Sequence, residues 1–163
     1  MLEFRLKEVT ATLENVNLRT EKNGQDKAPA ADLKISCAMG VEVLAFFSAD
    51  LEGFIFNKNG PRDLADGLPL RDPHLVFPLV RDEEMDGATV KVGYGVGDPM
   101  AFPDSKVNTF RISGMNGGTV VVSFRVQCKP DAFKDVPHLY LLQEKGITIW
   151  VEPPELPKMK DAA

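Results

Sequence analysis

Residues 119–129, TVVVSFRVQCK, alternate between apolar and polar side chains along most of their length. Successive side chains of a β-strand point to opposite faces, so this period of two indicates a strand with one buried face. A helix needs apolar residues three and four positions apart, so the segment excludes a pure bundle of helices. The inward phase carries Val120, Val122, Phe124, Val126 and Cys128, and the outward phase carries Val121, Ser123, Arg125 and Gln127.

Shorter segments with the same period occur along the chain and predict about seven strands. Helical spacing appears in residues 43–55 and 137–146, which we predict as two short helical insertions, the second ending at Gly146 as a left-handed cap. We therefore expect an α+β fold, mainly antiparallel β, built as one sheet or as a two-sheet sandwich. We expect residues 1–152 to form a single domain and the proline-rich residues 153–163 to form a tail.

The N-terminal segment changes phase twice. Phe4 lies on one phase, Val9 and Leu13 lie on the opposite one, and Val16 returns to the first. Because strand side chains repeat every two residues, each change predicts a bulge or bend in one long extended segment. The polar residues 21–31, EKNGQDKAPAA, then predict a long hairpin loop.

The net charge of the chain is −5 and its hydrophobic content is 44%. That content favours a packed core over disorder. An acidic chain repels nucleic acid on average, so a nucleic-acid site needs a local basic patch. The chain has no apolar run near the roughly 20 residues that cross a bilayer, and its first ten residues do not resemble a signal peptide. We expect a cytoplasmic protein that makes no use of a membrane.

The chain contains two cysteines and two histidines, and they are far apart in the sequence. Cys37 and Cys128 each lie on the apolar phase of a predicted strand, so we expect two buried, reduced thiols. His74 and His138 do not complete a zinc site with them, and nothing marks a nucleophile with its base. We expect no metal, no cofactor and no enzymatic activity.

Residues 90–98, VKVGYGVGD, place three glycines on one phase of a predicted strand. Glycine weakens a strand but allows another backbone to approach closely, so this phase predicts a low floor. If the strands over 106–113 and 119–129 lie beside this strand, cations flank the glycines and no carboxylate lies among them. Arginine suits phosphate as a ligand because its donors form a planar fork. The predicted binding residues are Lys91, Gly93, Gly95, Gly97, Arg111, Arg125 and Lys129.

An alternative interpretation of this face is purely structural. Polar and basic residues on the outward phase are typical of any half-exposed antiparallel sheet, and the glycines can serve internal packing. A binder of single strands also needs aromatic rings for base stacking. Tyr94, Phe110 and Phe124 fall on the core phase, so only Phe102 and Phe133, which we place in loops, remain for that role.

A second candidate surface is acidic. Its carboxylates lack the alternating ligand positions of a calcium loop, so a solvated turn or a docking surface for a basic partner is the better interpretation. The predicted acidic patch is Asp82, Glu83, Glu84 and Asp86, with Asp63, Asp66 and Asp72 in the loop before it.

Three segments of the second half carry a resemblance to a group of known proteins. The run GGTVVVSFRVQCKPD, followed after a predicted helix by ITIWVEPPE and preceded by VGYGVG, resembles small uncharacterised proteins of tailed bacteriophages. This resemblance covers roughly the second half of the chain and carries no catalytic residues. It implies a phage product acting in the bacterial host cytoplasm, as an accessory factor of DNA replication and recombination or as an inhibitor of host defences.

Two functions follow from these observations. We expect a non-enzymatic protein-binding module, such as an inhibitor of a host nucleic-acid-targeting defence complex, because net charge and missing stacking rings disfavour nucleic acid. The alternative is a nucleic-acid-binding accessory protein that uses the basic sheet face. A homodimer through an open strand edge or through the apolar residues 46–56 is also compatible with the sequence.

Overall fold

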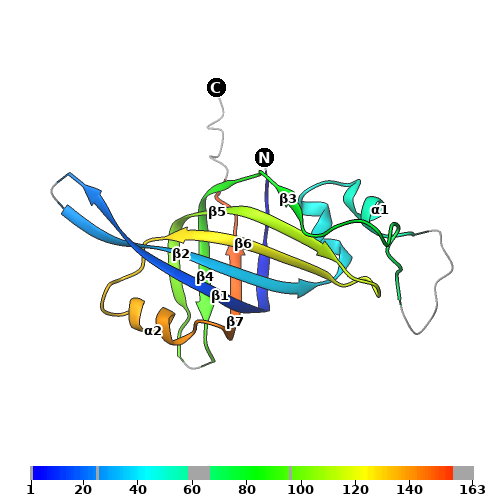
Figure 1. The fold of residues 1–163 in the computed structure, drawn as a ribbon. Helices are drawn as coiled ribbons and strands as arrows, with labels where there is room; N and C mark the ends of the chain where they lie inside the picture. Colours follow the sequence, from blue (N-terminus) through cyan, green and yellow to red (C-terminus); the bar gives the residue numbers. More distant parts are fainter. Residues whose placement is uncertain (1, 25, 59–66, 96, 156–163) are drawn as a thin grey trace, which may run out of the picture.

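The computed structural model describes residues 2–24, 26–58, 67–95 and 97–155, and within them the chain is mainly antiparallel β (Figure 1). The predicted fold class is confirmed, and both predicted helical regions are present. The elements are β1 (Leu6–Asn23), β2 (Asp26–Met39), the 3-10 helix η1 (Val41–Phe46), α1 (Leu51–Ile55), β3 (Leu79–Arg81), β4 (Met85–Gly93), β5 (Met100–Gly114), β6 (Val120–Cys128), α2 (Val136–Leu141) and β7 (Lys145–Glu152).

The seven strands found in the described residues form one sheet, in the order β3-β5-β4-β7-β1-β2-β6. A further pairing between β5 and β6 joins the two sides of this sheet. Six strands therefore close into a ring, β1-β2-β6-β5-β4-β7, in which every pairing is antiparallel. β3 lies outside this ring and pairs with β5 alone. Of the two architectures expected, the structure has the single sheet, closed on itself.

The core of the ring is built around an aromatic cluster. Phe4, from the segment before β1, is fully buried, and its ring centroid lies 5.1 Å from that of Phe110 and 5.4 Å from that of Phe124. Phe47, just after η1, packs 5.7 Å from Phe4. Leu139 of α2 is also fully buried, and Figure 1 places α2 and α1 at opposite ends of the sheet.

Both predicted bulges of the N-terminal segment are confirmed. The register of β1 shifts between Leu6 and Val9 against β7, and again between Leu13 and Asn15 against β2. Glu8 has a positive φ of 51°, as expected where an extra residue is accommodated. The extra residue at each bulge changes which phase of side chains faces the core. One continuous β1 can therefore supply core residues from both phases.

The predicted loop over residues 21–31 is wrong. β1 and β2 stay paired to Asn23 and Asp26, so the reversal is confined to a tight turn. β1 pairs with β7 only as far as Leu13, and β2 pairs with β6 only from Ala31 onward. Residues 19–23 of β1 and 26–30 of β2 therefore pair only with each other among the described strands. They form a two-stranded arm that projects from the closed sheet (Figure 1, blue).

Two glycine assignments also need correction. β4 ends at Gly93, and the next residues form a turn in which Gly95 and Gly97 have φ angles of 88° and 76°. These left-handed values explain the glycines, since other residues are strained there. At the end of α2 the left-handed residue is Glu144 rather than Gly146, which already belongs to β7.

The cysteines are free and buried, as predicted, and desolvation raises the pKa of Cys37 and Cys128 to about 12. Across the described residues, no helix has the length and apolar character needed to span a membrane. Of the predicted tail, residues 156–163 lie outside the described residues.

Candidate anion-binding site

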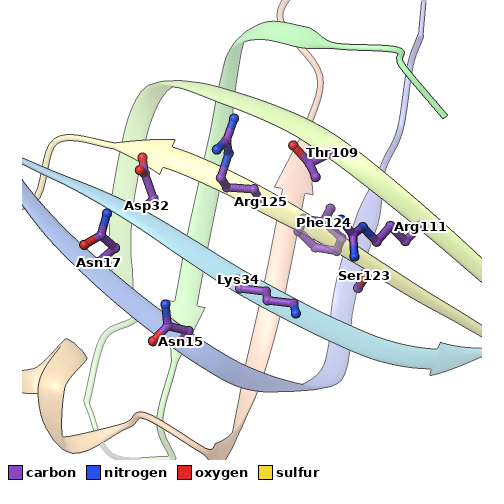
Figure 2. Close-up of a pocket in the computed structure, with 9 residues that line it drawn as sticks. All are labelled: Asn15, Asn17, Asp32, Lys34, Thr109, Arg111, Ser123, Phe124 and Arg125. Carbon is purple, nitrogen blue, oxygen red and sulfur yellow. The ribbon is translucent and has the colours of Figure 1, made fainter. Parts of the chain in front are cut away.

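A hollow of about 290 Å³ lies on the outer face of the sheet (Figure 2). Four neighbouring strands, β1, β2, β6 and β5, supply its side chains. It is open to solvent and predominantly polar in its residues. The lining residues are Asn15, Asn17, Asp32, Lys34, Thr109, Arg111, Ser123, Phe124 and Arg125.

Strand register brings the three cations of the hollow to one surface. Lys34 of β2 is the direct cross-strand partner of Arg125 on β6. Arg111 of β5 is paired with Ser123, two residues before Arg125 on the same strand. Directly opposed residues on neighbouring strands point to the same face, so all three side chains lie on the outer surface.

A bulge in β5 decides which of its side chains face the hollow. The register against β6 shifts between Asn108 and Arg111, and Thr109 has a positive φ of 56°. As a result Val107, which simple alternation places outward, is fully buried. Simple alternation counted back from Arg111 fails here because it cannot include an inserted residue. The bulge leaves Thr109 and Arg111 outward.

The bulge also creates a buried amide that holds Arg125. Asn108 is only 4% exposed, and its Oδ1 accepts hydrogen bonds from Arg125 Nε at 3.0 Å and from Thr109 Oγ1 at 3.1 Å. Its Nδ2 donates to Gln127 Oε1 at 3.2 Å. Within the described part of the chain, the two terminal nitrogens of Arg125 have no protein partner. They remain available to a ligand.

The only carboxylate among the lining residues is already engaged. Asp32 Oδ1 accepts a hydrogen bond from Arg19 Nε at 3.1 Å, in an ion pair with that guanidinium. Lys34, Arg111 and Arg125 have no carboxylate within 4.0 Å among the residues that the structure describes. The hollow therefore carries an excess of positive charge, together with neutral amide and hydroxyl groups. This combination suits an anion, and phosphate in particular.

The structure brings together only part of the predicted binding set. Arg111 and Arg125 line the hollow, whereas Lys91 pairs across β4 with Ala101 at the start of β5. Arg111 lies ten residues further along β5, and Lys91 is not among the residues that line the hollow. Lys129 lines a second hollow of about 410 Å³, to which β1 contributes Arg19 and Glu21. The second hollow is lined by Arg19, Glu21, Asp86, Gly87, Asp104, Ser105, Lys106, Gln127, Cys128 and Lys129.

The glycines do not form a floor beside the arginines. Gly93 is buried, and a Cβ placed on it would lie 3.1 Å from Cζ3 of Trp150 on β7. The indole covers this position, so the missing side chain makes room for the protein's own packing. Gly95 and Gly97 belong to the turn after β4. The alternative interpretation, in which the glycines serve internal packing and turns, therefore agrees with their positions in the structure.

The acidic patch is partly neutralised by two neighbouring cations. Glu83 accepts a hydrogen bond from Arg81 Nε at 2.6 Å. Glu84 and Asp86 lie 3.8 and 3.5 Å from Lys106 Nζ. Asp82, the fourth member, is exposed. In the described ranges no group of three His, Cys, Asp or Glu residues is placed to hold a metal ion.

The remaining loop aspartates divide into two groups. Asp63 and Asp66 lie outside the described residues. Asp72 Oδ1 accepts the backbone N–H of His74 at 2.9 Å, which is a local turn contact.

Sequence reasoning missed the N-terminal half of the hollow. Lys34, Asn15 and Asn17 lie on the outward phases of β2 and β1, and their alternation was visible. What the sequence did not reveal was the pairing of β2 with β6, which joins the first hairpin to the last strand of the meander. Without this pairing, nothing in the sequence placed Lys34 beside Arg125.

Comparison with protein-family models, with curated proteins and with solved structures finds no match for this chain. The resemblance to proteins of tailed bacteriophages stays a prediction. The geometry and the charge of the hollow are therefore the features that bear on function.

Proposed function

We propose that this chain is a non-enzymatic nucleic-acid-binding protein whose outer sheet face over β1, β2, β6 and β5 contacts the phosphate backbone. The observation that supports the proposal is the convergence of Lys34, Arg111 and Arg125 on one hollow without a carboxylate partner. In a chain of net charge −5, three such cations on one surface are a local exception. An accessory role in phage DNA replication or recombination accords with the resemblance of the second half.

The size of the effect follows from counterion release. Each phosphate of a single strand that is neutralised by a cation contributes about −0.7 to the slope of log K against log salt. Three cations predict a slope of about −2, so a tenfold rise in salt should weaken binding about a hundredfold. Binding should therefore be detectable at low salt and lost at high salt.

The test is fluorescence polarisation of a labelled oligonucleotide against the full chain over a salt series. The double variant Arg111→Gln with Arg125→Gln should weaken binding at low salt and reduce the slope by about 1.4. The matched control is Lys58→Gln with Arg81→Gln, which removes the same charge from two cations already paired with Glu52 and Glu83. That control should bind nearly as the parent does.

Two results would contradict the proposal. One is the absence of binding by the parent protein at low salt to both single- and double-stranded oligonucleotides. The other is an equal loss of affinity in both double variants, because net charge alone would then account for the effect.

A second candidate function, a protein-binding module such as an inhibitor of a host defence complex, is favoured by a different surface. Among the strands that the structure describes, β3 pairs with β5 only. Val80 on β3 is 68% exposed, and Phe54 on α1 is 53% exposed. An open edge with exposed apolar side chains suits the addition of a partner's strand. Affinity capture from bacterial lysate should then recover a stoichiometric partner that is lost on Val80→Lys, which places a charge on this edge. Recovery of no such partner would argue against this candidate.

A further inference from the structure

Phe133, between β6 and α2, is 94% exposed, more than any other large apolar side chain that the structure describes. Its backbone is nevertheless held in an ordered turn. Asp131 Oδ1 accepts the N–H groups of Phe133 and Lys134 at 2.9 and 2.8 Å. The buried Asp135 in turn accepts the N–H of Asp131 at 2.9 Å. The backbone N–H groups of Lys134 and Phe133 also lower the pKa of Asp131, so the carboxylate that holds the turn stays ionised.

This ring continues the line of cations along β6. Lys129 comes directly after that strand and lies about 13 Å beyond Arg125, at the rise of an extended chain. Phe133 follows four residues later, so its Cα lies at most about 14 Å from that of Lys129. A polymer held at Arg125 that follows β6 toward Lys129 would therefore come within reach of an exposed aromatic ring.

Two aromatic rings of β5 and β6 are turned inward. Phe124 contributes to the lining of the hollow but is 1% exposed, and so is Phe102, which the sequence placed in a loop and the structure places in β5. The prediction that Phe102 is free for stacking is therefore wrong. Of the two candidates, Phe133 alone is available to a ligand.

We infer that the nucleic acid bound at the hollow is single-stranded, and that one of its bases stacks on Phe133. The inference rests on the proposed function, since the hollow must first hold the phosphate backbone. A paired base lies within the duplex stack and cannot reach a ring beside it, whereas a single strand presents its bases to aromatic side chains. Proteins that bind single-stranded nucleic acid commonly combine cations that contact the backbone with exposed aromatic rings on which the bases stack.

The experiment compares two ligands of equal length and equal phosphate count, an oligothymidylate and an abasic oligomer of about eight units, which lies within the usual range of site sizes. Phe133→Leu should lower affinity for the oligothymidylate by about 5- to 150-fold and leave affinity for the abasic oligomer unchanged. Phe133→Trp should restore binding. Because Phe133 is exposed, neither variant should disturb folding.

The matched control is Phe54→Leu, which changes an exposed ring on α1 at the opposite end of the sheet (Figure 1). It should bind both ligands as the parent does. A parent protein that prefers a duplex of the same sequence would also contradict the inference.

Each outcome of these measurements decides for or against the inference. A selective loss with the base-bearing ligand supports the inference. An equal loss with both ligands, or no loss with either, overturns it while leaving the phosphate contact in place. Unchanged oligonucleotide affinity with altered self-association in light scattering also overturns it, because the ring would then be a protein contact. If the parent binds neither ligand, the proposed function fails as well.

Discussion

The buried amide of Asn108 offers the sharpest test of how the hollow is built. Asn108→Ala removes two hydrogen bonds to neutral partners and one to the guanidinium of Arg125. Hydrogen bonds contribute about 0.5–1.5 kcal/mol when neutral and about 1.5–3 kcal/mol when one partner is charged. Because Arg125 and Gln127 are half-exposed and regain water, we expect a loss of only about 2–3 kcal/mol in the free energy of unfolding.

Asn108→Asp separates stability from binding. The new carboxylate keeps the acceptor that Arg125 and Thr109 use and loses only the donor to Gln127. We expect the free energy of unfolding to change by about 1 kcal/mol or less. The added negative charge, however, pairs with Arg125 and should weaken oligonucleotide binding, reducing the salt slope by about 0.7.

Unfolding in urea, followed by fluorescence of Trp150, the single tryptophan of the chain, measures the first effect. Fluorescence polarisation over a salt series measures the second. Combining Asn108→Asp with Arg125→Gln should give no further loss of slope, since both changes remove the same cation. The reasoning is refuted if Asn108→Ala costs less than about 0.5 kcal/mol, or if Asn108→Asp binds oligonucleotide as tightly as the parent.

Three further predictions concern the fold. Gly93→Val should displace the indole of Trp150, shifting its fluorescence emission to longer wavelength, and should cost about 1–3 kcal/mol in urea unfolding. The pKa of Cys37 and of Cys128 is about 12 in the folded state, so above about pH 9 only the unfolded state releases these two protons. Urea unfolding should therefore show a free energy of unfolding that falls from pH 9 to pH 12. The fall should be smaller in a variant in which both cysteines are valine. Leu139→Ala empties a buried site under α2 and should cost about 2–5 kcal/mol by the same assay.

Local patterns in the sequence were sufficient for the strands and for the bulges of β1. The alternation over residues 119–129 corresponds closely to β6, and the two phase changes of the N-terminal segment correspond to its two register shifts. Both signals arise within one strand, where the period of two acts directly on neighbouring residues. The tight hairpin at Gly24 was missed because polar residues on an exposed arm resemble a loop.

The closure of the sheet could not be predicted in the same way. The pairing of β2 with β6 joins segments about ninety residues apart, and no local period reports it. The bulge at Thr109 could not be predicted either, because the alternation from Val107 to Arg111 is unbroken in the sequence. The inserted residue turns Val107 toward the core and leaves Arg111 on the outer face. The sequence therefore identified Arg111 and Arg125 but grouped them with Lys91 instead of Lys34.

Net charge was the observation that most strongly opposed nucleic-acid binding, and the structure explains why its weight is limited. At physiological salt, charges separated by more than about 8 Å are largely screened, so the total of −5 acts weakly at the surface of the hollow. Several carboxylates are also consumed in pairs close along the chain, such as Glu21 with Arg19 and Glu83 with Arg81. The cations of the hollow share it mainly with amides and hydroxyls, and its one carboxylate, Asp32, is paired with Arg19. The local field that a ligand experiences is thus set by strand pairing, which composition does not describe.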